Sequence, residues 1–210
     1  NYRLQKKVEV SNGAVVSAHP LASQVGVQIL KQGGNAVDAA IATQLALAVV
    51  YPGAGNIGGG GFLVGHLSNG KNIAIDYREK APAKASRDMY LDSAGNAVMA
   101  LSQDGHLSSG VPGTIAGLFA SLKYAKLPFK TLIQPAIELA EKGFKLTDAQ
   151  VDDFNESAKE FLRLNTSPVA FVKKGGWKKG DILIQKELAN TLKRIRDRGA
   201  RGFYEGETAR

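Results

Sequence analysis

The chain has 210 residues, of which 44% are hydrophobic and 22% charged, so its composition is that of a globular protein and excludes a wholly disordered chain. Its formal net charge of +8 comes from scattered lysines and arginines that are not interleaved with aromatic residues, which argues against a nucleic-acid-binding protein. The absence of cysteine excludes disulfides, thiol nucleophiles and cysteine metal ligands.

The first elements are expected between residues 13 and 34. The β-branched stretch "GAVVSAHP" predicts a strand that ends at Pro20. Apolar residues then recur at helical spacing and predict a helix, which two glycines close (Leu21, Val25, Ile29; Gly33, Gly34).

The second predicted helix spans residues 36–50, with Asn35 as its N-cap and Asp38 in its first turn. It is apolar nearly all round, which predicts that other elements cover it on every side. It is shorter than the roughly 20 residues of a membrane-spanning helix. We therefore interpret it as a buried core helix that ends before Pro52.

Two β-rich stretches, "FLVGHL" and "NIAIDYRE", flank Asn69-Gly70 and predict a β-hairpin. Side chains alternate between the two faces of a strand. One face of the second strand therefore carries apolar residues and the other carries polar and small ones (Ile73, Ile75, Tyr77; Ala74, Asp76, Arg78).

After about residue 108 the chain is predicted to be mostly helical. One apolar stripe follows "SSGVPG", a second helix holds Pro135 in its first turn and ends at Gly143, and a third begins with a Thr147–Gln150 capping box. The last helix is expected at about 185–198. No composition shift marks a boundary, so residues 1–210 are treated as one domain.

The glycine-rich stretch "GNIGGGG" (55–61) raises the question of a phosphate loop. A common phosphate loop follows a strand, precedes a helix and carries a lysine, whereas here a helix precedes the glycines and a strand follows them. Glycines also let two backbones approach closely. We therefore predict that this loop packs closely against another segment.

The residues alone indicate no self-sufficient active site. His19, His66 and His106 have no metal-ligand spacing and are interpreted as hydrogen-bonded loop or strand residues. Ser108-Ser109-Gly110 could be imagined as a nucleophile but better fits a turn that leads into a helix. From these residues the chain is an α/β domain without its own nucleophile.

Arg78 is the one residue whose setting suggests binding. An arginine at a strand end suits the bidentate binding of a carboxylate. The residues alone, however, favour an ion pair with Asp76 or Glu79.

Several ordered stretches together resemble the N-terminal part of the large subunit of γ-glutamyltransferases (γ-glutamyltranspeptidases). They are "AHPLASQVGVQILKQGGNAVDAAIATQLALAVVYPGAGNIGGGGF", "IDYREKAPAKASRDMYLD" and "SSGVPGTIAGL", followed by a looser match from "LIQPAIELAEKGF" to "GFYEG". The resemblance covers nearly the whole chain.

The resemblance implies an α+β fold, namely a helix-rich, N-terminal portion of the αββα sandwich of N-terminal-nucleophile hydrolases. In that family one precursor, a zymogen, cuts itself into a large and a small subunit. The new N-terminal threonine of the small subunit attacks the γ-glutamyl carbonyl, and an acyl-enzyme passes the group to water or an amine. No catalytic residue is therefore expected in this chain, and this fragment alone is expected to be inactive.

The resemblance also implies a role for Arg78, which is expected to bind the α-carboxylate of the γ-glutamyl group. The expected partners are the small subunit of the same precursor, in a heterodimer, and glutathione or another γ-glutamyl compound. We expect no cofactor, no metal ion, no nucleic acid and no membrane span. A start at Asn1 and an end in "GETAR", which reads as a helix opening, suggest a piece of a longer, exported protein, periplasmic or secreted by a bacterium.

Two alternatives stay open. The chain could belong to a related acylase or to a poly-γ-glutamate capsule depolymerase, which share the scaffold but differ in acyl group or acceptor. It could also be a non-catalytic module that keeps only the fold.

Overall fold

The computed structural model describes Lys7 and residues 9–210. Asn1, whose position suggested a removed leader, lies outside the described residues. The helices are α1 (Pro20–Lys31), α2 (Ala36–Val50), α3 (Met99–Gln103), α4 (Thr114–Ser121), α5 (Phe129–Lys142), α6 (Asp148–Leu164), α7 (Lys186–Arg198) and α8 (Arg201–Tyr204). The strands are β1 (Phe62–His66), β2 (Asn72–Asp76), β3 (Phe144–Lys145) and β4 (Ile182–Leu183).

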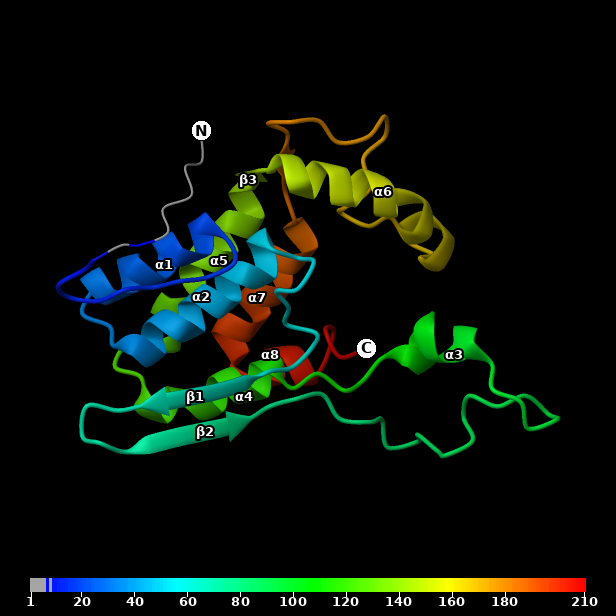
Figure 1. Cartoon of the computed structure of the whole chain (residues 1–210), viewed down its shortest axis with the longest axis horizontal. Coiled ribbons are helices and arrows are strands. Elements are labelled where there is room, and N and C mark those ends of the chain that lie inside the picture. The colour runs from blue at the N-terminus through cyan, green and yellow to red at the C-terminus, as the bar shows by residue number, and fades with distance from the viewer. Residues whose placement is uncertain (1–6, 8) are drawn as a thin grey trace.

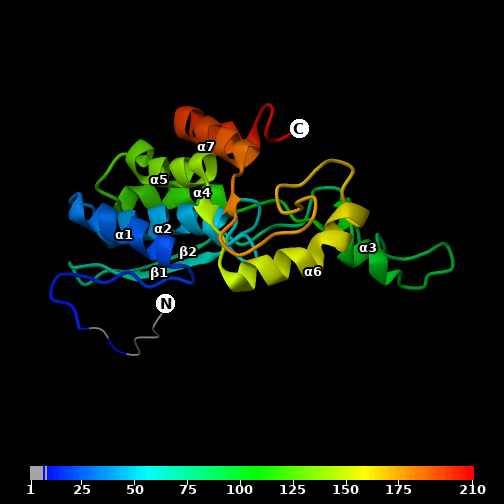
Figure 2. The ribbon, with the colours of Figure 1, turned by 90° about the horizontal axis from the view of Figure 1, so that it is seen from above.

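The body of the molecule is layered. Helices α1 and α2 lie side by side, with α5 and α7 on one side of them and the β1–β2 hairpin on the other (Figures 1 and 2). Helix α4 contacts both β2 and α2. The core is formed by apolar side chains, mostly from the helical layers, and the largest fully buried ones are Ile29, Ile41, Leu45, Val49, Ile115, Leu118, Leu132, Ile133, Ile137, Leu183, Leu192 and Ile195.

The hairpin forms as predicted. Strands β1 and β2 are antiparallel, with Phe62 opposite Asp76 and His66 opposite Asn72. The turn that joins them uses Gly70 at φ 81°, a conformation that favours glycine. Strands β3 and β4 form a second, two-residue pairing.

Several predicted caps are confirmed. Asn35 caps α2 by accepting from the backbone N–H groups of Val37 and Asp38. Asp38 completes a capping box, and the Thr147–Gln150 box opens α6. Helices α1 and α7 occupy the predicted ranges. Residues 206–209 form a turn, which the backbone N–H of Arg210 closes by donating to the Gly206 carbonyl (3.1 Å).

The predicted strand at 13–20 is wrong. Residues 13–17 are extended, but no strand pairing is recorded for them among the described residues. Their exposure alternates as in a strand, with Val15 half-buried against Gly26 of α1 and Val16 92% exposed. The local sequence favours extended backbone, but a strand also requires a neighbour to accept and donate hydrogen bonds.

Two details of the helices also differ from the prediction. α5 begins at Phe129, so Pro135 is inside the helix and not in its first turn. The buried stripe of α5 offsets the hydrogen bond that Pro135 cannot donate. α2 is buried except for one stripe, which is exposed or half-buried (Ala36, Ala40, Gln44, Leu47). In the part of the chain described here, no helix has the length and hydropathy that crossing a membrane would require.

Candidate substrate-binding site

Arg78 directly follows β2, and its side chain leaves the strand on the predicted face. Ile73 and Tyr77 are buried on the opposite face, where Ile75 is half-buried, while Arg78 itself is exposed. Asp76 accepts a hydrogen bond from the backbone N–H of Arg78, at 3.0 Å. Among the described residues, no ion pair and no side-chain hydrogen bond involves the Arg78 guanidinium. The guanidinium is therefore available to an anionic ligand.

A cleft of about 740 Å³ lies beside Arg78. Its walls are the chain from Ile75 to Lys80, the segment before α4, one side of α4, and Tyr204 of α8. The segment from Ile75 to Lys80 carries the charged residues of the cleft. Two are cationic, Arg78 and Lys80, and two are anionic, Asp76 and Glu79. The cleft thus combines a cationic group with small residues of α4 that leave room for a ligand.

Glycines surround the backbone next to Arg78. A Cβ atom at Gly60 would lie 2.7 Å from the Tyr77 carbonyl oxygen and 2.8 Å from the Arg78 Cα atom. One at Gly113 would lie 1.9 Å from the same carbonyl oxygen. A Cβ atom would also lie too close to the Tyr77 ring at Gly61 (2.7 Å) and at Gly117 (2.1 Å). The predicted close packing of the glycine stretch is therefore confirmed, and Tyr77 and Arg78 are what it packs against.

Hydrogen bonds hold the glycine stretch against the start of α4. The Gly59 carbonyl accepts from the backbone N–H groups of Gly113 (2.7 Å) and Thr114 (3.0 Å). Asn56 Oδ1 accepts from the Gly59 N–H (2.9 Å) and from the Thr114 hydroxyl (2.8 Å). Thr114 is fully buried, so this hydroxyl has its partner inside the protein. We call Asn56, Gly59 and Thr114 the Asn–Thr clasp.

Two tyrosines complete the surroundings of the cleft. Tyr204 donates to the Pro112 carbonyl (2.9 Å) and accepts from the Ala116 N–H (3.1 Å), which satisfies a free amide at the start of α4. Tyr77 donates to Gln44 of α2 (3.1 Å). Burial raises the pKa of the Tyr77 hydroxyl, and its hydrogen bond to Gln44 offsets part of that rise. Tyr77 is thus a neutral anchor between the hairpin and α2.

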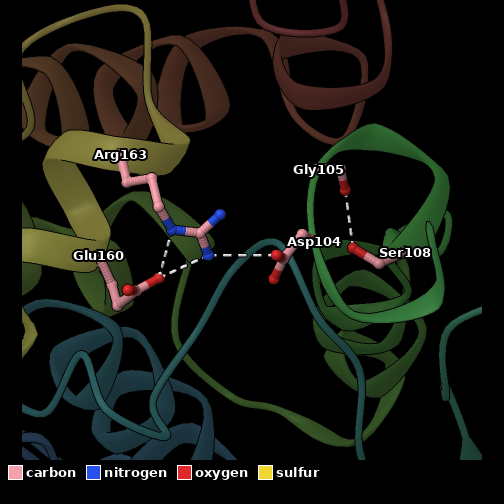
Figure 3. Close-up of polar contacts among 5 residues, drawn as sticks. All are labelled: Asp104, Gly105, Ser108, Glu160 and Arg163. Atoms are coloured by element: carbon pink, nitrogen blue, oxygen red, sulfur yellow. Dashed lines mark hydrogen bonds and ion pairs between the residues drawn. The ribbon is translucent and has the colours of Figure 1, made fainter. Parts of the chain in front are cut away.

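The chain beyond Arg78 forms a long arm, residues 80–111, that extends away from the body and contains α3 (Figure 1). Lys80 and Val111 close its base through two backbone hydrogen bonds of 3.1 and 2.7 Å. Arg163 of α6 joins the arm to the body by bonding both Glu160 (2.6 Å) and Asp104 (3.1 Å), as Figure 3 shows. Arg78 therefore stands beside the fixed base of this arm.

Ser108 lies on the arm in a short 3₁₀ helix (His106–Ser108), and its hydroxyl donates to the Gly105 carbonyl at 2.7 Å (Figure 3). This matches the predicted turn.

The three histidines lie in different settings. His106 is exposed, and His66 contacts Asn72 on the hairpin. His19 differs from the prediction because it caps α1: its Nδ1 accepts from the Leu21 N–H at 3.2 Å, while its Nε2 has no partner among the described residues. Burial lowers the pKa of His19.

Asn56, Thr114, Tyr77 and Tyr204 were not singled out from the sequence. Thr114 follows Pro-Gly at a helix start, where a hydroxyl residue is expected to bond local backbone, so its bond to Asn56 had no signal in the sequence. Asn56 resembles any other loop asparagine until its partner, 58 residues away, is known.

The family model described as gamma-glutamyltranspeptidase matches residues 22–210. The chain belongs to this family. Glutathione hydrolase proenzyme from Escherichia coli (strain K12) is 48% identical over 205 residues, 96% of this chain and 35% of the relative. The capsule biosynthesis protein CapD proenzyme of Bacillus anthracis is 41% identical over 197 residues, 93% of this chain and 34% of the relative. This member of the family thus spans about a third of the length of its curated relatives.

Comparison with solved structures also supports membership of this family. Helicobacter pylori gamma-glutamyltranspeptidase matches with a TM-score of 0.92 and 50% identity, covering 97% of this chain and 59% of that one. Cephalosporin acylase from Bacillus halodurans matches with a TM-score of 0.80 and 29% identity, covering 100% of this chain and 40% of that one. The predicted fold class is confirmed: this chain is a helix-rich α+β portion of the N-terminal-nucleophile hydrolase fold.

Proposed function

We propose that this chain is the N-terminal part of the large subunit of an enzyme that hydrolyses or transfers γ-glutamyl groups, and that Arg78 binds the substrate's α-carboxylate. The observation that carries the proposal is the setting of Arg78. Its guanidinium is exposed beside a cleft, and no described residue pairs with it. A guanidinium can donate two parallel hydrogen bonds to one carboxylate.

In this proposal, the nucleophile that attacks the substrate lies in the rest of the precursor. A threonine at the start of a small subunit, produced when the precursor cleaves itself, attacks the γ-carbonyl carbon. The amine leaves, and water or an acceptor amine then takes the acyl group from the threonine oxygen. Support comes from relatives named glutathione hydrolase proenzyme, which also makes glutathione the first substrate to test. The present chain contributes substrate binding.

Substitution of Arg78 in the full-length, processed enzyme tests the proposal. Hydrogen bonds to charged groups are worth roughly 1.5–3 kcal/mol each. Arg78→Lys keeps the charge but loses the planar fork, so the KM for a γ-glutamyl anilide should rise about tenfold or more. Arg78→Ala should raise it further, because the carboxylate would then be unpaired. Self-cleavage should survive both changes, since no substrate carboxylate takes part in it.

A structural role for Arg78 makes the opposite prediction. If Arg78 mainly pairs with Asp76 or Glu79, its substitution should impair folding or processing and leave the KM of whatever matures nearly unchanged. A KM of the Arg78→Lys enzyme within about twofold of the parent, equivalent to about 0.4 kcal/mol, would overturn the substrate-binding role.

A second candidate activity has its own support. The similarity to the CapD proenzyme makes action on a capsule polymer such as poly-γ-glutamate the alternative. Assays of one processed enzyme with glutathione and with poly-γ-glutamate separate the two. Faster turnover of the polymer would replace the first proposal, and no turnover of either by a correctly processed protein would favour a non-catalytic module.

We also infer that the protein acts in the periplasm or outside the cell, which rests on the family resemblance, with the lack of cysteine merely compatible. Fractionation of producing cells tests this. Activity confined to the cytoplasmic fraction would refute it.

A further inference from the structure

Asn56 and Thr114 of the Asn–Thr clasp lie outside the residues that line the cleft beside Arg78. Its members are distant in the sequence, 58 residues apart for Asn56 and Thr114. The clasp ties the glycine stretch to the first residues of α4 through Asn56 Oδ1 and through the Gly59 carbonyl. These two segments are the ones that enclose the backbone of Tyr77 and Arg78.

The two segments pack tightly against the backbone of Tyr77 and Arg78. Gly60 approaches the Tyr77–Arg78 backbone from one segment and Gly113 approaches it from the other, each too closely to accept a methyl group. Gly61 and Tyr77 also exchange backbone hydrogen bonds of 3.3 and 3.0 Å. The spacing between the two glycine-bearing segments therefore determines where the Arg78 backbone lies, and the clasp sets that spacing.

We propose that Asn56 and Thr114 are positioning residues, which hold the backbone of Arg78 so that its guanidinium meets the α-carboxylate of the substrate. The inference rests on the proposed role of Arg78. Neither residue lines the cleft, so each acts through Arg78 and not by touching the substrate. A displacement of about 1 Å at a binding group is enough to weaken catalysis strongly.

The test uses the full-length, processed enzyme and two donors, a γ-glutamyl anilide and the 4-aminobutanoyl anilide, which lacks only the α-carboxylate. The measured quantity is the kcat/KM for the γ-glutamyl anilide divided by the kcat/KM for the 4-aminobutanoyl anilide. Thr114→Val removes the hydroxyl and keeps the shape of the side chain, whereas Thr114→Ser keeps the hydroxyl and is the matched control. Asn56→Ala breaks the clasp from its less buried side, in case Thr114→Val does not mature.

Thr114→Val and Asn56→Ala should each lower the ratio at least threefold, mainly through the KM of the γ-glutamyl anilide, while Thr114→Ser stays within about twofold of the parent. A merely structural role would reduce activity toward both donors equally and leave the ratio unchanged, which would overturn the inference. Arg78→Lys separates the two failures. If it lowers the ratio and the clasp variants do not, only the positioning role is wrong; if it leaves the ratio unchanged, the proposed role of Arg78 itself is wrong.

Discussion

At the residue scale, Gly113 and Gly60 are positions next to the cleft at which there is no room for a side chain. A methyl group at Gly113 would overlap the Tyr77 carbonyl oxygen, and one at Gly60 would collide with backbone atoms of residues 77–79. Backbone atoms cannot rotate out of the way as a side chain can. A methyl group at either position therefore has to displace Arg78 or the start of α4.

We predict that Gly113→Ala lowers the free energy of unfolding by about 1–3 kcal/mol or more, because overpacking forces the backbone to shift. Gly58→Ala is the matched control in the glycine stretch, since its Cβ would meet nothing within 4 Å and its φ is not positive. It should change stability by less than about 0.5 kcal/mol. Urea denaturation of the three proteins measures both effects. Equal stabilities for Gly113→Ala and Gly58→Ala would contradict the packing seen around Tyr77.

His19 should make stability depend on pH. Its Nδ1 must be unprotonated to accept from Leu21, and burial lowers its pKa below the usual value near 6.5. The unfolded chain therefore binds a proton more readily than the folded one. The contribution of His19 to stability is full above pH about 6.5 and is lost as the pH falls through the range below it.

His19→Asn keeps an N-cap side chain but cannot titrate. Its melting temperature should fall less than that of the parent between pH 7.5 and 5.5. The prediction fails if His19→Asn and the parent respond identically to pH.

At the element scale, the start of α2 is held by Asp38. This carboxylate is fully buried and accepts from the backbone N–H groups of Asn35 (2.8 Å), Lys126 (3.0 Å) and Leu127 (2.9 Å). It therefore joins the helix to the loop before α5, in addition to facing the positive end of the α2 dipole.

Asp38→Ala should lower the free energy of unfolding by about 3 kcal/mol, since three amides lose their acceptor at about 1 kcal/mol or more each. The control is Asp148→Ala at the start of α6. Asp148 pairs with Lys179 at the surface, so that change should cost less than about 1 kcal/mol. Thermal or denaturant unfolding measures both, and a cost of Asp38→Ala no larger than that of the control would refute this account.

At the scale of the whole molecule, two largely apolar surfaces are open to solvent. The open stripe of α2 and the extended segment at residues 10–17 line a groove of about 1300 Å³. On the hairpin, Phe62 and Val64 are 62% and 85% exposed on one face of β1. Apolar strand faces of this kind are normally covered by a second layer. Under the function proposed above, this layer would come from the rest of the precursor.

We therefore predict that the 210-residue chain alone binds a hydrophobic dye strongly and does not hydrolyse a γ-glutamyl anilide. The processed full-length enzyme should bind less dye per molecule and be active. Turnover by the isolated chain, purified free of small subunit, would contradict the assignment of the nucleophile to another part of the precursor.

The sequence by itself determined the elements whose signals are local. The caps of α2 and α6 and the Asn-Gly hairpin follow from residues a few positions apart, because capping and turn formation depend on neighbouring backbone groups. The family could also be predicted from ordered motifs, and with it the candidate role of Arg78.

Only the tertiary structure decided what depends on contacts between distant residues. Residues 13–17 are extended without a strand partner, Pro135 lies inside a helix that core packing stabilises, and His19 caps a helix. The Asn–Thr clasp likewise joins residues 58 positions apart. The physical reason is the same in each case: local propensity selects a conformation, whereas burial and hydrogen-bond partners come from segments that the chain brings together only on folding.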